Sequence, residues 1–285
     1  MANTPTIPQP HQQRLRAHFG FTGLPFRKNV KIGNMFDSQS QRELRHGLAL
    51  WLEVRGLGLV TGPSGVGKSI SLRRFVADLP SDRYVVHHFG QIPTTPLGFC
   101  RALARRLDLR PRLHLADLFE DIRSTLGTHT DDHGTHPVLI LDDAEGMRPK
   151  TLDLVRRLTA HEMDGEDRVS ILLAGTERLL ATLRDPVLGP LRTRFGYAHQ
   201  LRPFGVEDAR NYVRYHVEAS GVQSRVFSDG AIQEAFNASQ GVPRQLNQLA
   251  LQALIDAVVH GTDEVDHRRM RRVVQAHPLY AAARG

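Results

Sequence analysis

The segment that most constrains this chain is a glycine-rich run between an apolar stretch and a helix. Residues 62–69 read Gly-Pro-Ser-Gly-Val-Gly-Lys-Ser. An apolar stretch over 57–61 comes directly before the run, and helical spacing follows it over about 68–78. A strand, a loop of the pattern G-x-x-x-x-G-K-S and a helix in this order are typical of a loop that wraps around phosphate groups. The sequence therefore predicts that the chain binds a nucleoside triphosphate.

Each residue type in this run has a part in holding phosphate. Glycines allow backbone N–H groups to turn inward, the lysine brings a positive charge to the β- and γ-phosphates, and the hydroxyl after it joins the Mg²⁺ shell. The N-terminal end of the next helix adds a favourable dipole. The predicted nucleotide-binding residues, the last of them also a metal ligand, are Gly62, Pro63, Ser64, Gly65, Val66, Gly67, Lys68 and Ser69.

A second apolar strand, over residues 138–142, ends in two carboxylates, Asp142 and Asp143. Beside the glycine-rich run, Asp142 is placed to hold Mg²⁺ through Ser69 or through water. Asp143 then lies where it can orient the water that attacks the terminal phosphate. The competing interpretation is a pair of aspartates that caps the following helix.

Apolar strands alternate with helical segments up to about residue 203. This alternation favours a parallel sheet covered by helices on both faces, with strands over 57–61, 84–89, 138–142, 168–174 and 197–201. Beyond residue 204 the apolar spacing is helical, over 206–219, 228–239, 243–259 and 263–276. The predicted fold class is therefore α/β, a P-loop NTPase sheet flanked by helices with a C-terminal helical lid domain.

The predicted domain plan has four parts. A flexible N-terminal tail, the nucleotide-binding α/β domain, the helical lid and a C-terminal tail follow one another over residues 1–18, 19–203, 204–276 and 277–285. Within this plan, the aromatic and turn-rich segment 19–26 is expected to pack on the edge of the nucleotide-binding domain.

The composition limits the compartment in which the chain is expected. A single cysteine, Cys100, cannot form a disulfide framework, which favours a reducing environment. The apolar runs are too short to span a bilayer, and the polar N-terminus lacks the apolar core of a signal peptide. We therefore expect a cytoplasmic protein without a membrane partner.

The charge of the chain is strongly basic. The net charge is +7, and only four of the 37 basic residues are lysines. Arginine suits bidentate contacts with phosphate, so this balance fits a polyanionic partner. The alternative is a genome that favours arginine codons, with the excess charge simply solvated.

Four stretches together resemble the AAA+ ATPases, and within them the ExeA-like and TnsC/TniB/MuB-like group. They are Phe-Gly-Phe-Thr-Gly-Leu-Pro-Phe over 19–26, the glycine-rich run, Leu141-Asp142-Asp143-Ala144 and Gly241-Val242-Pro243-Arg244-Gln245-Leu246-Asn247. The resemblance covers roughly residues 19–260. It implies an ATPase that uses ATP and Mg²⁺, with Arg244 as the arginine that senses the γ-phosphate.

The chain departs from this resemblance at one position. Most relatives carry glutamate directly after the metal-binding aspartate, whereas this chain carries Asp143. The shorter carboxylate predicts slow hydrolysis, with ATP acting mainly as an assembly switch. Glu145 lies two residues further on and could compensate, although the sequence does not show which way it points.

The resemblance also implies catalytic residues from later segments. Thr176 follows the strand 168–174 at the place of a polar sensor, and it suits a helix N-cap equally well. Arg194, and after it Arg192, lies where relatives present an arginine finger to a neighbouring subunit. A pair of surface arginines is the alternative. A finger that acts in a neighbour's site implies a homo-oligomer, as a ring or a helical filament.

Duplex DNA is the partner that the resemblance implies. In TnsC- and MuB-like relatives, ATP-bound subunits wind around DNA, and residues at two helix starts become the candidate phosphate contacts, here Thr94, Thr95, Arg148 and Lys150. No base-reading motif is present, which predicts sequence-independent binding.

The predicted function is an ATP-dependent regulator of DNA transposition that recruits or activates a transposase, with or without a target-selection adaptor. An ExeA-like ATPase of secretion or envelope assembly, and a nucleotide switch or scaffold that does not bind DNA, remain open as alternatives.

Overall fold

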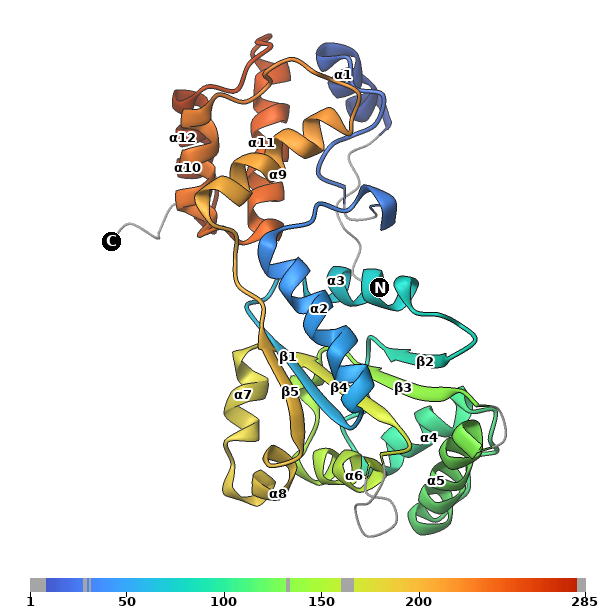
Figure 1. Cartoon of the computed structure of the whole chain (residues 1–285). Helices are drawn as coiled ribbons and strands as arrows, with labels where there is room; N and C mark the ends of the chain where they lie inside the picture. Colours follow the sequence, from blue (N-terminus) through green and yellow to red (C-terminus); the bar gives the residue numbers. More distant parts are fainter. Residues whose placement is uncertain (1–8, 28–29, 31, 132–133, 160–166, 281–285) are drawn as a thin grey trace. The chain divides into compact units, whose positions relative to one another are not determined.

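The structure is a computed structural model of the 285-residue chain, and it describes residues 9–27, 30, 32–131, 134–159 and 167–280. The chain divides into two compact units. One unit, the sheet unit, is Ser40–Arg202, and the other, the helical unit, combines Met1–Gln39 with Pro203–Gly285. Figure 1 traces the elements of each.

The sheet unit is built on five parallel strands in the order β2-β3-β4-β1-β5. Their bounds are Leu57–Thr61 for β1, Tyr84–Phe89 for β2, His136–Leu141 for β3, Ser170–Gly175 for β4 and Phe195–Gln200 for β5. The five predicted strands are confirmed, each within two residues at either end. This order places β1 between β4 and β5, so the strand that leads into the glycine-rich run lies inside the sheet.

Helices cover both faces of this sheet, which is why its central strands are apolar throughout. Alternate residues of β3 enter two separate cores, with Val138 and Ile140 in one and Leu139 and Leu141 in the other. The first core is closed by α2 (Gln39–Val54) and α3 (Lys68–Asp78). The second is closed by α4 (Pro96–Arg106), α5 (Leu115–Asp131), α6 (Pro149–Thr159), α7 (Glu177–Leu183) and α8 (Gly189–Arg192) (Figure 1). The predicted α/β fold with a parallel, doubly covered sheet is confirmed.

Two helices of the sheet unit differ in length from their predicted bounds. Amphipathic spacing over 114–126, followed by the polar residues 127–136, predicts a helix that ends before Gly127, but α5 continues through Asp131. The apolar spacing over 149–163 predicts another helix, which is α6. It ends at Thr159, and residues 160–163 lie outside the described residues. Cys100 is fully buried in the second core, and burial raises the pKa of its thiol to about 12. It is a core residue.

The helical unit holds α1 (Gln9–Phe19), α9 (Val206–Glu218), α10 (Asp229–Ser239), α11 (Pro243–Val259) and α12 (His267–Ala276). The sequence predicts the four C-terminal helices. It does not predict α1, because its polar character favours a flexible tail over residues 1–18. Leu15 of this helix is 2% exposed and belongs to the core of the helical unit. The sequence 9–19 has few apolar residues, so one buried leucine gives too weak a periodic signal.

The aromatic segment 19–26 also differs from its expected place. The sequence favours the edge of the nucleotide-binding domain, but Phe21 and Phe26 are buried in the core of the helical unit. The ring of Phe26 lies edge-on to Phe227, with 6.0 Å between the centroids, and the backbone N–H of Thr22 donates to the carbonyl of Ser220 across 2.8 Å. Large aromatic rings gain more by filling a core of short helices than by lying on a sheet edge. The expected boundary at residue 19 is therefore corrected to about residue 40.

Short 3₁₀ turns complete the described structure at Ile32–Asn34 (η1), Ala144–Gly146 (η2) and Pro186–Leu188 (η4). The second of these follows β3 closely and carries Glu145. Among the described residues, none of the helices combines the length and the apolar character that a membrane crossing requires.

Candidate nucleotide-binding site

The glycine-rich run follows β1 and forms an open loop before α3. Three of its glycines have positive φ angles, 151° at Gly62, 83° at Gly65 and 113° at Gly67, which side chains strongly disfavour. A Cβ atom on Gly62 would lie 2.4 Å from the carbonyl oxygen of Leu201, so no larger residue fits there. The backbone therefore has the conformation that a phosphate cradle requires, and it fits ATP.

Lys68 opens α3 with its side chain folded back over this loop. The residue is 6% exposed, and its Nζ donates hydrogen bonds to the carbonyl oxygens of Gly62 at 2.8 Å and Pro63 at 3.1 Å. Burial lowers the pKa of Lys68, while the carboxylates of Glu145, Asp142 and Asp143 act in the opposite direction. The ammonium group is thus anchored to the loop and lies within electrostatic reach of the carboxylates that follow β3.

Asp142 and Ser69 are the oxygen donors predicted for Mg²⁺. Asp142 is 4% exposed at the end of β3, where its backbone N–H donates to the carbonyl of Phe89 across 2.9 Å. Ser69, the second residue of α3, is exposed. Hydroxyl and carboxylate oxygens suit Mg²⁺, which keeps several waters and needs few protein ligands. Within the described residues there is no group of three or more His, Cys, Asp or Glu side chains that could cage a metal.

Asp143 and Glu145 follow Asp142 but are held differently. Asp143 is exposed and has left-handed backbone angles, with φ 57° and ψ 40°, at the start of η2. Glu145 is half-buried in η2 and reaches across to the end of β4. Its Oε1 accepts a hydrogen bond from the hydroxyl of Thr176 at 3.1 Å, and its Oε2 accepts one from the backbone N–H of Thr176 at 3.4 Å.

Thr176 is the N-cap of α7, as one of its two predicted interpretations required. Its hydroxyl accepts a hydrogen bond from the backbone N–H of Arg178 at 3.4 Å. The same hydroxyl contacts Glu145, which brings a predicted sensor residue to the carboxylates after β3. Sequence reasoning does not find this contact, because Glu145 and Thr176 are 31 residues apart and belong to different strand ends.

The two arginines proposed for a finger differ in their surroundings. Arg192, at the end of α8, donates through Nη1 to the carbonyl oxygens of Leu183 at 2.8 Å and Asp185 at 3.1 Å. Its guanidinium therefore ties α8 to the end of α7. Arg194 lies between α8 and β5 and is half-buried. Arg192 is thus bonded within its own chain, and the finger role of either arginine stays a prediction.

Arg244 belongs to the helical unit, in the first turn of α11, and is exposed. The preceding turn depends on Gly241, whose φ is 71° and whose carbonyl accepts a hydrogen bond from the backbone N–H of Phe204 at 2.9 Å. A Cβ atom on Gly241 would lie 2.2 Å from the carbonyl oxygen of Phe204. The turn thus fixes the position of Arg244 within its unit, and its role toward ATP stays a prediction.

The four predicted DNA contacts come together on the sheet unit. The carbonyl of Thr94 accepts hydrogen bonds from the backbone N–H of Arg148 at 3.4 Å and from the hydroxyl of Thr151 at 2.7 Å. These bonds join the start of α6 to the loop before α4, where Thr95 caps the helix by accepting from the Gly98 N–H. All four residues are exposed: Thr94, Thr95, Arg148 and Lys150. We call this surface the α4–α6 ridge.

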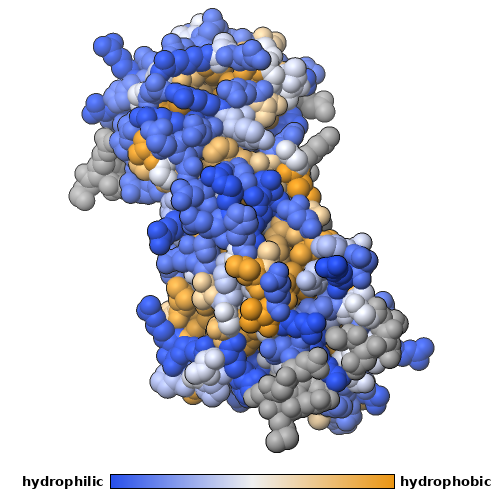
Figure 2. All heavy atoms as spheres, viewed as in Figure 1, coloured by the Kyte–Doolittle hydropathy of each residue, from blue (hydrophilic) through white to orange (hydrophobic). Residues whose placement is uncertain are grey.

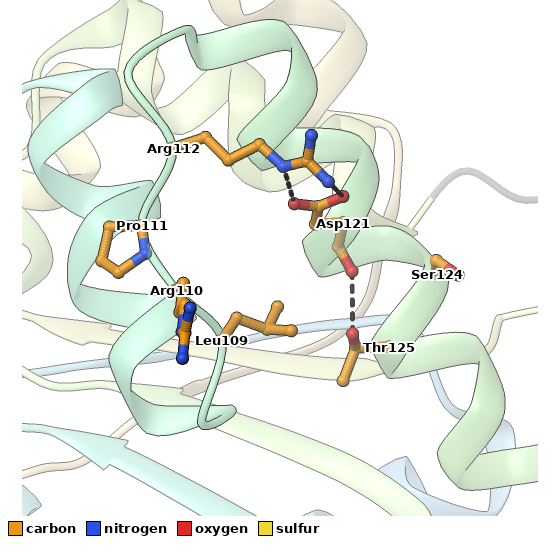
Figure 3. A pocket seen from close by; sticks show the side chains of 7 residues that line it. All are labelled: Leu109, Arg110, Pro111, Arg112, Asp121, Ser124 and Thr125. Atoms are coloured by element: carbon orange, nitrogen blue, oxygen red, sulfur yellow. Dashed lines mark hydrogen bonds and ion pairs between the residues drawn. The ribbon is translucent and has the colours of Figure 1, made fainter.

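A shallow pocket of about 510 Å³ lies elsewhere, between the end of α4 and α5. It is lined by Leu109, Arg110, Pro111, Arg112, Asp121, Ser124 and Thr125 (Figure 3). Arg112 pairs with Asp121 through two hydrogen bonds, one of 3.1 Å, which balances the charge of that guanidinium. The pocket contains none of the predicted nucleotide residues and no glycine cradle, so we do not assign it to ATP.

A parallel sheet with a cradle after β1 and an aspartate at the end of β3 defines the P-loop AAA+ fold. Residues 52–183 match the family described as an AAA domain. That segment contains the glycine-rich loop, the carboxylates after β3 and Thr176, and it accounts for most of the sheet unit.

Curated relatives match a larger part of the chain. General secretion pathway protein A from Aeromonas hydrophila is 27% identical over 256 residues, which cover 87% of this chain and 46% of the relative. The Holliday junction branch migration complex subunit RuvB from Arthrobacter sp. (strain FB24) is 26% identical over 251 residues, which cover 82% of this chain and 60% of the relative. The chain therefore spans less than two thirds of the length of either relative.

Solved structures show the same fold at lower identity. Cdc6p from Pyrobaculum aerophilum has a TM-score of 0.61 and 18% identity over 91% of this chain and 70% of that one. A chain of the Drosophila ORC bound to DNA has a TM-score of 0.62 and 13% identity, covering 96% of this chain and 68% of that one. At such identities the likeness concerns the fold alone.

Proposed function

We propose that this chain is an ATPase that switches between assembled and dispersed states on duplex DNA and regulates DNA transposition. The observation that carries the nucleotide part is the buried Lys68, bonded to the backbone of a loop whose glycines leave room for phosphate. A buried cation against such a loop has no use in packing alone, because burial of an ammonium group is costly.

In the proposed reaction each residue group acts on a different part of ATP. Lys68 and the loop hold the β- and γ-phosphates, and Ser69 and Asp142 hold Mg²⁺. A carboxylate after β3, for which the sequence suggests Asp143, orients the attacking water, and Thr176 senses the terminal phosphate. Arg244 is proposed to contact the γ-phosphate of its own subunit.

An arginine finger requires a neighbouring subunit, and the proposal therefore includes a homo-oligomer, as a ring or a filament. Arg194 would neutralise the charge that develops on the transferred phosphoryl group in the adjacent site. Exposed apolar residues support self-association. Leu50 and Val54 of α2 are 63% and 70% exposed, and apolar side chains reach the surface of the sheet unit in Figure 2. Surfaces of this kind commonly mark protein contacts.

The α4–α6 ridge supports the proposal that the assembly binds DNA. Two hydroxyls and two cations on one exposed surface suit phosphate contacts, which need no base sequence. The similar Drosophila ORC structure is bound to DNA, and the name of the Arthrobacter relative refers to Holliday junctions. Recruitment of a transposase belongs to this proposal and rests on the sequence resemblance, whereas the cytoplasmic location that we also propose rests on the composition.

A second candidate function is favoured by one comparison. The match to general secretion pathway protein A covers 87% of this chain. In that case the ATPase cycle would drive a secretion or envelope assembly, and the α4–α6 ridge would face a protein partner. DNA binding separates the two candidates.

The decisive experiment is electron microscopy of the purified protein with duplex DNA, with a non-hydrolysable ATP analogue or with ADP. The DNA proposal expects rings or filaments on DNA with the analogue only. Dispersed particles in both nucleotide states, together with no shift of DNA in a gel at low salt, would favour the secretion candidate.

A matched pair of charge reversals tests the ridge itself. Lys150→Glu changes the charge of an exposed ridge residue, and Arg83→Glu makes the same change before β2, at the opposite ends of the strands. We expect Lys150→Glu to weaken DNA binding and to lower the slope of log affinity against log salt by about one. Equal effects of both variants would show a response to net charge and contradict the ridge.

A further inference from the structure

Glu145 occupies a position that the sequence did not define. It lies in η2, three residues after Asp142, and its carboxylate contacts the residue that follows β4. Both carboxylate oxygens are engaged there, one by the Thr176 hydroxyl and one by the Thr176 backbone N–H. The side chain is therefore directed along the carboxyl edge of the sheet.

The donor and acceptor roles of the Thr176 hydroxyl are fixed by its two partners. The backbone N–H of Arg178 can only donate, so the Thr176 hydroxyl must accept from it. The single hydroxyl proton is then available to Glu145, which accepts it at 3.1 Å. Both carboxylate oxygens of Glu145 thus accept hydrogen bonds from Thr176.

The sheet register brings this carboxylate to the phosphate loop. Strands β1 and β4 are neighbours, and Thr61 at the end of β1 pairs with Gly175 at the end of β4. The glycine-rich loop begins at the residue after Thr61, and Thr176 is the residue after Gly175. Glu145 therefore contacts the end of β4 beside the point where β1 leads into the glycine-rich loop.

Gly175 makes the approach possible. A Cβ atom at this position would lie 2.7 Å from Oε2 of Glu145 and 2.8 Å from Cδ2 of Leu179. The missing side chain leaves the space that the carboxylate uses.

Asp143 differs from Glu145 in its exposure and in its backbone conformation. It is exposed, and its left-handed backbone makes it the turn residue between β3 and η2. Aspartate is among the few residues that accept this conformation readily, which is a sufficient reason for its presence. Its position directly after the metal-binding aspartate is thus explained by the turn.

We infer that Glu145, held by Thr176, is the carboxylate that orients and deprotonates the attacking water, and that Asp143 serves the turn. The inference rests on the proposed ATP hydrolysis. The water oxygen bonds to the γ-phosphorus as the bond from that phosphorus to the β–γ bridging oxygen breaks. The water proton passes to Glu145 and then to the phosphate or to solvent, leaving ADP and inorganic phosphate. Thr176 is a positioning residue for this carboxylate.

Three isosteric variants test the inference, with two readouts for each. Glu145→Gln and Asp143→Asn remove the competing carboxylates. Glu177→Gln is the control, since Glu177 is an exposed glutamate at the start of α7 that also acts electrostatically on Lys68. The first readout is phosphate release with DNA and Mg²⁺. The second is the identity of the nucleotide that stays on the protein, ATP or ADP, after loading with ATP and gel filtration.

We expect Glu145→Gln to lower turnover at least ~100-fold, the usual scale of a general base, while the protein retains ATP that remains unhydrolysed. Asp143→Asn should lower turnover less than about tenfold, and Glu177→Gln should match the wild type. Thr176→Val should lower turnover and leave ATP affinity within about threefold, because it releases the carboxylate without touching the loop.

Three results would overturn the inference. Turnover lost in Asp143→Asn and kept in Glu145→Gln returns the role to Asp143. ATP binding lost together with turnover in Glu145→Gln makes Glu145 a structural residue of the loop. A wild-type protein that binds ATP and releases no phosphate, with or without DNA, removes the proposed hydrolysis as well. The last result is separate from the others because it appears without any substitution.

Discussion

Nζ of Lys68 lies 2.8 Å from the carbonyl oxygen of Gly62, the first residue of the loop that this lysine closes. A second bond to Pro63 holds the ammonium group on the same side. The side chain is therefore oriented by the backbone of the loop itself. Phosphate oxygens, which carry charge, are stronger acceptors than these carbonyls and can compete for the same donors.

Lys68→Ala should weaken nucleotide binding strongly. The substitution removes a buried cation whose bonds to phosphate are charge-assisted, and a loss of roughly 2.7 kcal/mol corresponds to a ~100-fold weaker affinity. Titration with a fluorescent ATP analogue measures this directly. Lys150→Ala removes the same charge from the exposed ridge and serves as the control. An ATP affinity in Lys68→Ala within about threefold of the wild type would contradict the proposed site.

Gly241→Ala should destabilise the helical unit more than Gly261→Ala. Both glycines have positive φ angles, 71° and 64°, so both alanines bear a conformational cost of about 1 kcal/mol. Only at Gly241 would the new Cβ meet backbone, 2.2 Å from the Phe204 carbonyl oxygen, whereas nothing lies within 4 Å at Gly261. We expect a further loss of about 1–3 kcal/mol at Gly241. Chemical unfolding of both variants measures the difference, and equal losses would refute the close contact.

Arg192→Ala and Arg194→Ala should have separable effects. Loss of the Arg192 bonds to Leu183 and Asp185 releases α8, and about 1 kcal/mol lost would lower Tm by roughly 2–4 °C. Arg194→Ala should keep ATP affinity but lower turnover about 1,000-fold, as expected for a lost arginine finger. Thermal unfolding and phosphate release are measured on both. An Arg192→Ala protein that is as stable as wild type yet inactive would transfer the finger role to Arg192.

The helical unit should lose stability as pH falls below 6.5, the ordinary pKa of histidine. His216 is 7% exposed, its ring lies 4.4 Å from that of Tyr212, and burial lowers its pKa to about 4. The unfolded chain takes up a proton near pH 6.5 and the folded chain only near pH 4, so protonation favours the unfolded state between these values. At about pH 5 the loss is up to about 2 kcal/mol.

Thermal unfolding between about pH 7 and pH 5 tests this dependence. His216→Phe should flatten the profile, because phenylalanine suits the surrounding rings and does not titrate. His46→Gln removes an exposed histidine from α2 and should leave the profile as it is in the wild type. A profile that stays steep in His216→Phe would assign the pH dependence to other groups.

Much of the fold was predictable because its signals are local. The apolar run of β3 and the loop after β1 are each a short continuous stretch of sequence. A strand, loop and helix of this pattern are compatible with few other folds. Helix α1 and the burial of Phe26 were not predictable in the same way. Their place depends on which core offers an apolar surface, and that core is assembled from segments about 200 residues away.

The residues of the candidate site also differ in how far the sequence alone predicts them. Lys68 and Asp142 could be assigned from motif and spacing, since neighbouring positions fix where their side chains lie. The contact between Glu145 and Thr176 depends on the pairing of β1 with β4 and on the turn angles at Asp143. Neither follows from sequence spacing, so the contact of the Glu145 carboxylate with the residue after β4 emerged only from the three-dimensional arrangement.

Thr176 caps the start of α7, and α7 ends at Leu183, whose carbonyl accepts a hydrogen bond from Arg192 of α8. A segment of fewer than twenty residues thus connects the residue that contacts Glu145 with Arg194. If Arg194 acts in a neighbouring subunit as proposed, a shift of Glu145 that moved Thr176 would act on that arginine through this segment. The proposed assembly would then link the nucleotide state of one subunit to the site of the next.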